Sequence, residues 1–377
     1  MKIYSEEKWK KVRLEECAVI TMGQSPASTT YNYEKEGIPF YQGNADFGDI
    51  YPKIKCYCTK PIKIANKEEI LLSVRAPVGK INIANTRCCI GRGLCSIKVK
   101  ENKCEMKFLY YLLKSKEKNL NERANGSTFK AINKNQISEI DFYLPNIEIQ
   151  KKIVLILDKL VEILRDKKEI LLQLEELSKS IFIEMFGDPI KNEKKWIKIQ
   201  LQEECEIITG NTPSRKEKEY YGNYIEWIKS DNIIPFTLYP TKAKEFLSEI
   251  GVKKGRKIEK NNILMTCIAG SINSIGNVSI TDREVSFNQQ INGIKVQKNN
   301  VWFMFKQFEF SKKYIQSSIT MSLKGILSKS KLSELYFIFP PIELQNQFAE
   351  RIKMIEKSKF LFEKYRIKDI LNLNYKK

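Results

Sequence analysis

The sequence contains no histidine in its 377 residues, so the side chain that most often serves as a general base or metal ligand near neutral pH is absent. It also has no run of about 18 apolar residues that could span a membrane, and its first residues contain no apolar signal core. We therefore expect a cytoplasmic protein with no membrane partner, whose function does not depend on histidine chemistry.

Motifs for nucleotide, cofactor and methyl-transfer chemistry are missing as well. Gly79-Lys80 is not a P-loop, because no glycine precedes it at the required spacing and no serine or threonine follows it. Phe339-Pro-Pro-Ile342 lacks both the polar first residue and the aromatic last residue of the tetrad found in amino-methyltransferases. The sequence therefore argues against an independent enzyme and predicts no catalytic residue.

The cysteines do not form a recognisable metal-binding or disulfide pattern. Cys56-x-Cys58 and Cys88-Cys89 provide four thiols, but neither pair has the spacing of a zinc site, and no histidine can complete one. The count of nine is odd, and nothing indicates export. We expect reduced, mostly buried cysteines and no metal site: Cys17, Cys56, Cys58, Cys88, Cys89, Cys95, Cys104, Cys205 and Cys267.

Basic residues outnumber acidic ones, 65 against 45, which gives a net charge of +20 and a pI near 9.3. Such a surplus indicates a polyanionic partner, most simply nucleic acid, with an anionic membrane surface as the alternative. The chain is long enough for two domains, each with its own core.

One long amphipathic segment organises the chain. A helix is expected from residue 147 to 184, and apolar residues recur from Ile153 to Met185 in alternating steps of four and three, which indicates a heptad seam with Lys167 and Ser178 as polar interruptions. A helix of this length would be roughly 57 Å long, and Gly187-Asp188-Pro189 should end it. A second apolar row lies beside the seam and predicts a partner helix, although an ordinary core helix would also be amphipathic. The seam contains Ile153, Leu157, Leu160, Leu164, Leu171, Leu174, Ile181 and Met185, and the second row contains Ile156, Ile163, Ile170 and Leu177.

The chain contains an internal repeat. Trp9 and Trp196, Gly23 and Gly210, and Pro26 and Pro213 are each 187 positions apart. The offset becomes 193 between Ile70-Leu-Leu-Ser73 and Ile263-Leu-Met-Thr266, and 195 between Pro145-Asn-Ile-Glu-Ile-Gln150 and Pro340-Pro-Ile-Glu-Leu-Gln345. Insertions in surface loops would produce such a drift, so we expect two similar modules.

Each copy is predicted to be a β-rich module followed by a long helix. Strands are expected at residues 38–41, 69–74, 94–99 and 291–296, and shorter helices at 106–118 and 301–316. In the second long helix, Phe348, Ile352, Ile355 and Phe362 continue the seam, and Lys359 is its polar interruption. The expected fold is α+β: two tandem β-rich domains alternating with two long helices that pair as an antiparallel coiled coil, with pseudo-twofold symmetry. The predicted boundaries are 1–144 and 190–339 for the modules, and 145–189 and 340–377 for the spacer helices.

This order of weak motifs resembles the DNA specificity subunit of type I restriction-modification systems. The resemblance is carried by PNIEIQKKI and PPIELQNQF at the module ends, by the long helices after them, and by Met185-Phe-Gly-Asp-Pro189. It implies two target-recognition domains, each reading half of a split DNA sequence, and helices that set the spacing and dock two methyltransferase subunits. S-adenosylmethionine, and Mg/ATP where restriction or translocase subunits join, would be bound by those partners. No second Met-Phe-Gly-Asp-Pro follows the second helix, so the resemblance does not extend to its far end.

Polar loops at equivalent places in both copies are the predicted contacts with double-stranded DNA. Lysine and arginine suit phosphates, whereas arginine, asparagine, glutamine, serine and threonine can reach base edges. Each residue could instead belong to a plain solvated loop. The predicted residues are Gln24, Ser25, Gln42, Asn44, Arg75, Lys80, Arg87, Arg92, Ser127, Thr128 and Lys130 in the first copy, and Thr212, Ser214, Arg215, Lys229, Ser230, Asn288, Gln289, Gln290, Ser322 and Lys324 in the second.

Two other classes of protein remain open from the sequence. A coiled-coil scaffold would explain the long helices, but it would not explain two modules with polar loops. A standalone bipartite DNA-binding protein without methyltransferase partners would explain both, and only the partner-facing surface of the helices distinguishes it.

Overall fold

The computed structural model describes residues 9–123, 131–235, 237–319 and 325–364. The chain forms two compact units, residues 1–164 and 165–377, and each is described by itself. Within the described ranges, no helix is both long and apolar enough to cross a membrane.

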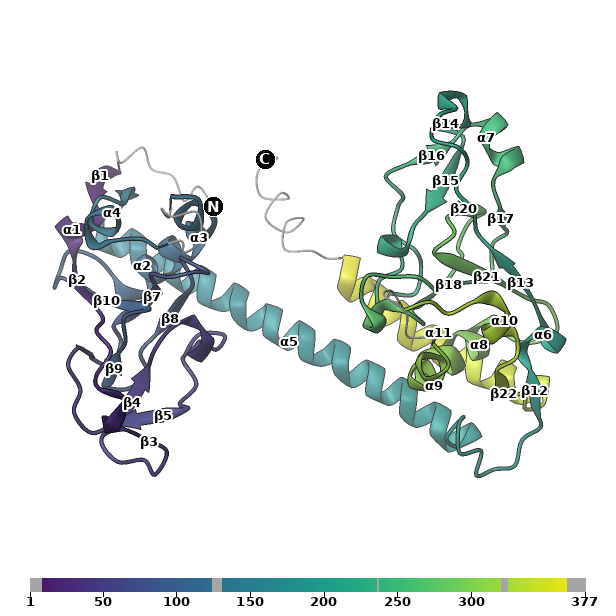
Figure 1. The fold of residues 1–377 in the computed structure, drawn as a ribbon, viewed down its shortest axis with the longest axis horizontal. Helices are drawn as coiled ribbons and strands as arrows, with labels where there is room; N and C mark the ends of the chain where they lie inside the picture. The colour runs from purple at the N-terminus through teal and green to yellow at the C-terminus, as the bar shows by residue number, and fades with distance from the viewer. Residues whose placement is uncertain (1–8, 124–130, 236, 320–324, 365–377) are drawn as a thin grey trace. The chain divides into compact units, whose positions relative to one another are not determined.

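The first unit contains two β-sheets, a two-stranded ribbon and flanking helices (Figure 1). One sheet has the antiparallel order β2-β10-β7-β8, the other has the order β3-β5-β4-β9-β6 with β4 and β9 parallel, and β1 pairs with β11. The strands are β1 (Lys10–Arg13), β2 (Ala18–Met22), β3 (Tyr31–Asn32), β4 (Ile38–Tyr41), β5 (Cys56–Cys58), β6 (Ile64–Ala65), β7 (Ile70–Ser73), β8 (Ile81–Ile83), β9 (Cys88–Ile90), β10 (Leu94–Val99) and β11 (Asp141–Leu144). The helices and 3-10 turns are α1 (Leu14–Cys17), η1 (Ser28–Thr30), η2 (Asn44–Asp46), α2 (Met106–Ser115), α3 (Glu117–Arg123) and α4 (Lys134–Ser138), followed by the start of α5 (Ile147–Phe186).

The second unit repeats this topology strand for strand. Its sheets have the orders β13-β21-β18-β19 and β14-β16-β15-β20-β17, with β15 and β20 parallel, and β12 pairs with β22. Its strands are β12 (Lys198–Gln200), β13 (Cys205–Thr209), β14 (Tyr221–Gly222), β15 (Ile225–Ile228), β16 (Phe246–Leu247), β17 (Lys257–Ile258), β18 (Ile263–Thr266), β19 (Val278–Ile280), β20 (Val285–Phe287), β21 (Ile291–Val296) and β22 (Tyr336–Ile338). Its helices and turns are α6 (Leu201–Glu204), η3 (Lys218–Tyr220), η4 (Ser230–Asn232), α7 (Glu249–Lys254), η5 (Ile272–Ser274), α8 (Val301–Phe310), α9 (Lys312–Ser317), α10 (Lys329–Ser333) and α11 (Ile342–Lys364).

Strands β7 and β18 are buried along their whole length because each lies between two cores. Side chains alternate across a strand, so Ile70 and Leu72 of β7 enter one core cluster while Leu71 enters another. In β18, Ile263 and Met265 face one cluster and Leu264 faces the other. These two strands therefore join the two sheets of each module.

The strands expected at residues 38–41, 69–74, 94–99 and 291–296 are confirmed, and the shorter helices differ from the prediction. Each region expected to be one helix is divided in two, at Lys116 between α2 and α3 and at Ser311 between α8 and α9. Both residues have ψ near zero, which turns the chain, so that Leu120 and Ile315 become buried. The repeat also shifts further than the sequence suggested, because β9 corresponds to β20 and therefore Arg92 corresponds to Gln289.

Helix α5 is continuous over 40 residues, about 60 Å, and confirms the predicted long helix. At its start, the Asn146 side chain accepts a hydrogen bond from the Ile149 amide at 3.0 Å, which caps a free N–H group. At its end, Gly187 adopts a positive φ of 77°. Asp188 then accepts hydrogen bonds from the Ile190 and Lys191 amides, and these bonds lower the pKa of its carboxyl group.

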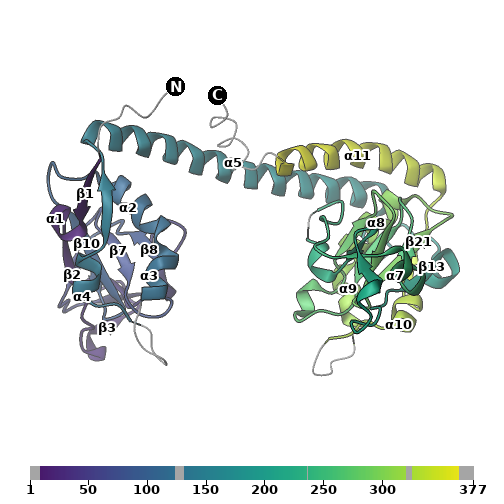
Figure 2. The same cartoon turned by 90° about the horizontal axis from the view of Figure 1, so that it is seen from above.

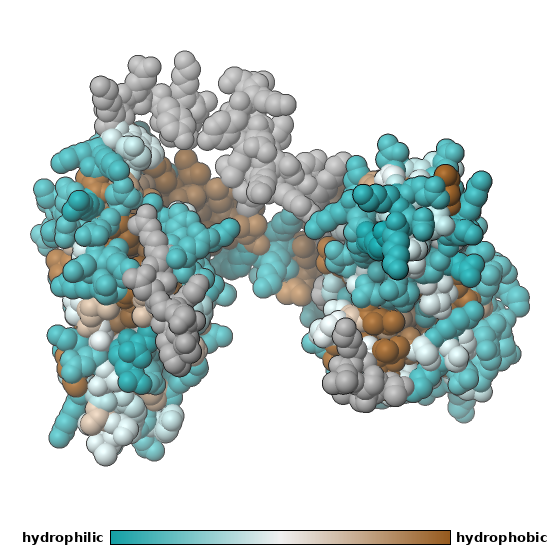
Figure 3. Space-filling view, turned by 45° about the horizontal axis from the view of Figure 1, so that its top comes forward, coloured by the Kyte–Doolittle hydropathy of each residue, from teal (hydrophilic) through white to brown (hydrophobic). Residues whose placement is uncertain are grey.

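In the second unit, α11 packs along residues 165–186 of α5 (Figure 2). Phe182 contacts Phe348, with ring centroids 5.4 Å apart, and Glu175 binds Lys359 at 2.6 Å. Because the order of contacts is reversed between the two helices, they are antiparallel, as predicted. The members of the second apolar row in this unit are not covered by α11, because Ile170 and Leu177 remain 36% and 48% exposed. Figure 3 shows that brown, apolar residues reach the surface in each unit.

A buried ion cluster joins α8 to both long helices. Lys306 is fully buried, and its Nζ lies 2.7 Å from Glu309, 2.7 Å from Glu356 and 3.6 Å from Glu175. Lys359 binds the same Glu175 and Glu356 at 2.6 and 2.9 Å. Burial raises the pKa of Glu309, whereas burial of Glu175 is outweighed by Lys306 and Lys359, which lower its pKa.

Candidate nucleic-acid interface

In the first module, the loops that follow β2, β4 and β9 meet at one end of the sheets. The amides of Gly23 and Gln24 donate to the carbonyls of Leu94 and Ile90, which ties the loop after β2 to the segment between β9 and β10. The Gly93 amide donates to the Gln42 carbonyl at 3.1 Å, and the Gly93 carbonyl accepts from Val74 at 2.9 Å. Loops from four distant parts of the sequence therefore form one surface.

The second module brings the corresponding loops together. The amides of Gly210 and Asn211 donate to the carbonyls of Ile291 and Phe287, and Asn288 donates to the Ile228 carbonyl at 3.0 Å. The Gln290 carbonyl accepts from the amides of Cys267 and Ile268 at 2.7 and 3.1 Å. Both modules thus build the same loop cluster from the same strand ends.

A glycine is required where the first of these loops begins. A Cβ atom at Gly23 would lie 2.2 Å from the Gly91 carbonyl oxygen, and one at Gly210 would lie 2.1 Å from that of Asn288. No side chain fits at such distances. The repeat of Gly23 as Gly210, visible in the sequence, therefore reflects the close approach of two backbone segments.

The predicted residues of the first module are not all in this cluster. Ser25 accepts a hydrogen bond from the Arg92 amide at 3.2 Å, and the Gly93 amide bonds to Gln42, so both residues lie beside the loop that contains Gln42 and Asn44. Arg87 instead precedes β9 and lies at the opposite end of that strand from Arg92. The remaining members, Gln24, Arg75 and Lys80, lie after β2 and β7 and are exposed, and Lys80 binds Glu117 at 2.6 Å.

In the second module, amide and hydroxyl side chains brace one another. Gln290 accepts hydrogen bonds from Ser230 at 3.1 Å and from Asn288 at 3.0 Å, and Thr212 bonds to Gln289. Asn288 is only 6% exposed, so it supports the loop, whereas Gln289 is exposed. Ser214 is also exposed, one residue before Arg215.

Arg215 and Lys229 share one carboxylate that the sequence did not identify. Arg215 binds Glu245 at 2.7 Å, and Lys229 binds the same side chain. Both cations lower the pKa of Glu245, and Glu245 raises the pKa of Arg215. Tyr221 and Trp227 form the surface beneath them, with the Arg215 guanidinium 4.6 Å and 5.2 Å from the two ring centroids. Arg215 and Lys229 were predicted as contacts, and the repeat offset of 187 pairs Phe40-Tyr41 with Trp227-Ile228, but nothing in the sequence pointed to Glu245.

Five predicted residues lie outside the described residues: Ser127, Thr128, Lys130, Ser322 and Lys324. The residues that follow these segments are placed. Ala131 forms a β-bridge with Arg75, and Ile326 forms the matching bridge with Ile268. The chain therefore rejoins each module at the loop after β7 or β18.

The described part of the chain contains no group of three His, Cys, Asp or Glu side chains that could hold a metal ion. All nine cysteines are free, and eight are buried, as predicted from their pattern. Burial raises the pKa of the Cys89 thiol to about 11 and that of the Cys95 thiol to about 12.

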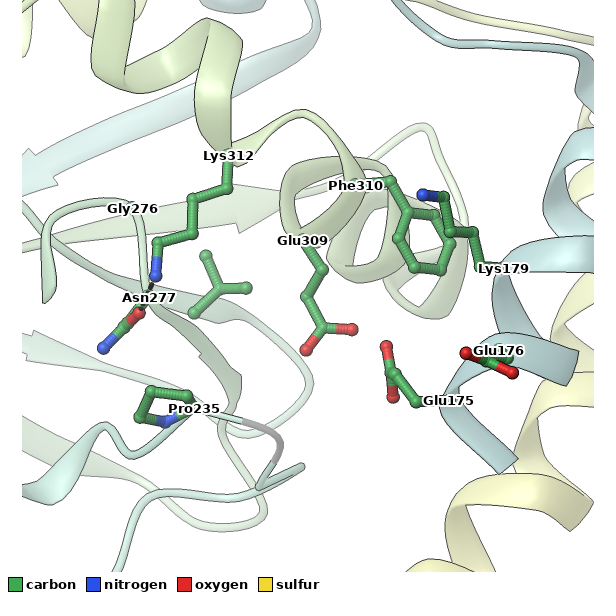
Figure 4. A pocket seen from close by; sticks show the side chains of 10 residues that line it. Glu175, Glu176, Lys179, Pro235, Gly276, Asn277, Glu309, Phe310 and Lys312 are labelled. Atoms are coloured by element: carbon green, nitrogen blue, oxygen red, sulfur yellow. Dashed lines mark hydrogen bonds between the residues drawn. The ribbon is translucent and has the colours of Figure 1, made fainter. Parts of the chain in front are cut away.

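A cavity of about 230 Å³ lies in the second unit between α5, α8, α9 and β19 (Figure 4). Its walls carry both signs of charge, including Glu175, Lys179, Glu309 and Lys312, and Lys312 donates to the Asn277 side chain at 2.5 Å. None of the predicted DNA-contacting residues lines it. The cavity and the loop cluster are therefore separate features.

Comparison with known proteins also finds two copies of one domain in this chain. The family model of the type I restriction modification DNA specificity domain matches residues 6–176 and 193–373. A protein of Methanocaldococcus jannaschii, provisionally named as the specificity subunit of type I restriction enzyme MjaX, is 44% identical over 180 residues, which is 46% of this chain and 42% of that relative. The type I restriction enzyme EcoBI specificity subunit of Escherichia coli is 22% identical over 393 residues, covering 93% of this chain and 79% of that one.

The fold agrees with a solved structure of the same class. The crystal structure of the type I restriction-modification S subunit from M. genitalium superposes with a TM-score of 0.61 at 16% identity, covering 97% of this chain and 93% of the other. At 16% identity, this superposition shows that the two chains share a fold. Membership of the family is shown by the two matched family domains. With two such domains covering most of its length, the chain belongs to the family of DNA specificity subunits of type I restriction-modification systems.

Proposed function

We infer that this chain reads a bipartite DNA target, with one half-site recognised by each module. The observation that carries this proposal is the matched loop cluster: the same strand ends bring the same loops together in both modules, but the side chains differ. Gln42 and Arg92 in the first module correspond to Lys229 and Gln289 in the second. Two sites with one scaffold and different polar groups suit two different base sequences.

The long helices would fix the distance between the half-sites. Helix α5 is uninterrupted from Ile147 to Phe186, and α11 pairs with its second half in antiparallel fashion. One heptad spans about 10 Å of helix, or about three base pairs of duplex DNA. The proposed division into modules at 1–144 and 190–339, with spacers at 145–189 and 340–377, follows from this role.

Methyltransferase subunits, two in the simplest arrangement, would bind the helices and modules and carry out the methylation of adenine. They would supply S-adenosylmethionine, and restriction or translocase subunits could join the same complex. The exposed apolar row on α5, which includes Ile163, Ile170 and Leu177, supports a partner at this helix. The chain itself would perform no chemistry.

The test is the map of methylated sites in cells that contain this chain and its candidate methyltransferase. Wild-type chain should produce one split motif. A Gln42→Ala, Arg92→Ala double variant should change only one half of that motif, and a Thr212→Ala, Gln289→Ala double variant should change only the other. Changes in both halves from either variant would contradict one module per half-site.

Two further measurements address the spacer and the DNA contact. A seven-residue insertion after Leu164 should alter the preferred gap and leave the half-site sequences unchanged, and indifference of the gap would contradict the spacer role. Binding to duplex DNA should fall by on the order of a thousandfold between 50 and 200 mM salt if several phosphates are neutralised. No chain-dependent methylation beside an active partner would favour a standalone DNA-binding or scaffold protein.

A further inference from the structure

Both modules contain the same aromatic platform beneath the loop cluster. In the first, Tyr31 stacks on Phe40 with ring centroids 4.7 Å apart, and its hydroxyl donates to the Pro26 carbonyl at 2.9 Å. In the second, Tyr221 packs edge-on against Trp227 at 5.9 Å, and its hydroxyl donates to the Pro213 carbonyl at 2.7 Å. The platform therefore holds the loop after β2 or β13 in the same way in each module.

The groups that surround the platform differ between the modules. In the pairing of β4 with β5 and of β15 with β16, Cys56 occupies the place of Glu245. Gln42 occupies the place of Lys229 after the central strand. The loop from Pro213 to Tyr221 is also longer than its counterpart, and it contains Arg215 where the first module has only Ala, Ser and Thr residues. The second module thus adds two cations and a carboxylate to a shared scaffold.

Arg215 is held by three contacts that fix the plane of its guanidinium group. The group lies 4.6 Å from the Tyr221 centroid and 5.2 Å from the Trp227 centroid, and its Nη1 atom lies 2.7 Å from Glu245 Oε2. Nε and Nη2, on the edge away from this bond, have no bond to another described residue, and the side chain is 56% exposed. An oriented guanidinium with one free edge has the donor geometry that matches guanine O6 and N7.

The loop that carries Arg215 is itself braced. The Asn211 side chain donates to the Lys254 carbonyl at 2.6 Å, and Trp227 Nε1 donates to the Asn211 carbonyl at 3.3 Å. Thr212 bonds to Gln289 on the neighbouring loop. Because hydrogen bonds hold the backbone before Arg215 at several points, DNA binding should cost little conformational entropy in this loop.

We propose that Arg215 reads a guanine in the half-site of the second module, with Glu245 as the residue that positions it. This inference rests on the function proposed above. It assigns the base class for one position and identifies a carboxylate that the loop pattern did not reveal. Lys229, bound to the same carboxylate, holds Glu245 from the other side.

The geometry favours base reading over a phosphate contact. Arg215, Lys229 and Glu245 together have a net charge of only +1, and the carboxylate next to Arg215 would repel a phosphate. A phosphate can be reached by flexible cations from several directions, whereas a bidentate pair with guanine requires the guanidinium to lie in the plane of the base with one edge facing it. The aromatic platform and Glu245 supply that orientation.

The experiment selects bound sequences from a pool of randomised DNA duplexes, using the full-length chain together with its methyltransferase partner. We expect Arg215→Ala and Arg215→Lys to lose the preference for guanine at one position in one half-site, by on the order of ten- to a hundredfold. Lysine keeps the charge but lacks the planar guanidinium fork that the aromatic platform and Glu245 orient, so its failure would separate geometry from charge. Glu245→Gln, which can still accept a hydrogen bond, should keep more of this preference than Glu245→Ala.

The matched control is Lys216→Ala, which removes a positive charge from the next, exposed residue and should leave the motif intact. Arg215 is exposed, so its variants should retain the wild-type thermal unfolding temperature. An unchanged motif for Arg215→Ala would overturn the proposal. So would a uniform loss of affinity for all sequences, rescued by lysine, because that result indicates a phosphate contact. If the wild-type chain selected no split motif, the proposed function would fail as well, which distinguishes the two failures.

Discussion

Replacing Lys306 should strongly destabilise the second unit. Its ammonium group is fully buried and binds Glu309 and Glu356 at 2.7 Å, with Glu175 at 3.6 Å. Lys306→Met keeps the apolar part of the side chain but leaves three carboxylates with Lys359 as their only cation in the cluster. Breaking a buried ion pair by removing one partner costs about 3–5 kcal/mol, so we expect a loss of that size at pH 7.

The loss should depend on pH in a defined direction. Without Lys306, the carboxyl pKa values in the folded protein rise above the unfolded value of about 4.3, because Lys359 alone cannot offset the burial of three carboxylates. Burial already raises the pKa of Glu309 in the intact cluster. Groups with raised carboxyl pKa values bind protons more tightly in the folded state, so stability falls as the pH rises through those values. The destabilisation should therefore be smaller at pH 5 than at pH 7.

Urea unfolding followed by tryptophan fluorescence would measure this effect, because Trp196, Trp227 and Trp302 all belong to the second unit. The matched control is Lys257→Met, which breaks an exposed ion pair with Glu284 at 2.6 Å in the same unit and should change stability little. Adding Glu309→Gln and Glu356→Gln to Lys306→Met should restore part of the loss. A Lys306→Met protein that lost less than about 1 kcal/mol, or equally at both pH values, would refute the reasoning.

Three other perturbations test particular contacts. Phe182→Ala removes a buried ring that lies 5.1 Å to 5.7 Å from four other phenylalanine rings, and it should cost about 3–5 kcal/mol in the same urea assay, whereas Leu172→Ala at a 55% exposed position should change stability little. Gly210→Ala should lower the stability of the second unit by about 1–3 kcal/mol and weaken DNA binding, because its Cβ would lie 2.1 Å from a carbonyl oxygen. Gly43→Ala has open space around the Cβ, so it should change neither stability nor DNA binding. Iodoacetamide should modify Cys56 first in the folded protein, because the other eight cysteines are buried. Labelling should become faster as the pH rises, since burial raises the pKa of Cys56 and the thiolate is the reactive form. Equal labelling of Cys58 or Cys89, detected by mass spectrometry, would contradict the structure.

The repeat and the periodicity allowed most of the architecture to be predicted. Short β-branched or aromatic runs predicted β4, β7, β10 and β21, and the heptad seam predicted α5 and its antiparallel partner. The seam also showed Lys359 as a polar interruption, but Lys306 was hidden inside the apolar run Val301–Phe310, and its partners lie on two other helices. A buried ion cluster depends on the packing of helices, which a single sequence does not specify.

The candidate site was predicted as a set of loops but not as a set of side-chain contacts. Matching Gly23 with Gly210 located equivalent turns in the two modules, where the close approach of two backbone segments requires glycine. Arg215, Lys229 and Glu245 come from three separate segments, and loops of unequal length separate them in the two copies. They meet around Trp227 because of the order and pairing of the strands, which the sequence alone did not specify.

The place where α5 joins the second unit limits how such a chain can be divided. Phe182, Phe186 and Glu175 lie before the turn at Gly187, yet they pack into the core and the ion cluster of the unit that follows. A gene fragment that began at the second module, near residue 190, would encode a protein lacking part of its own interior. Exchange of the first module between related genes would therefore preserve the second only if the crossover fell before about residue 165, within the helix. The middle of α5, rather than the loop after it, is therefore the position at which two related chains could be joined without dividing the core of the second unit.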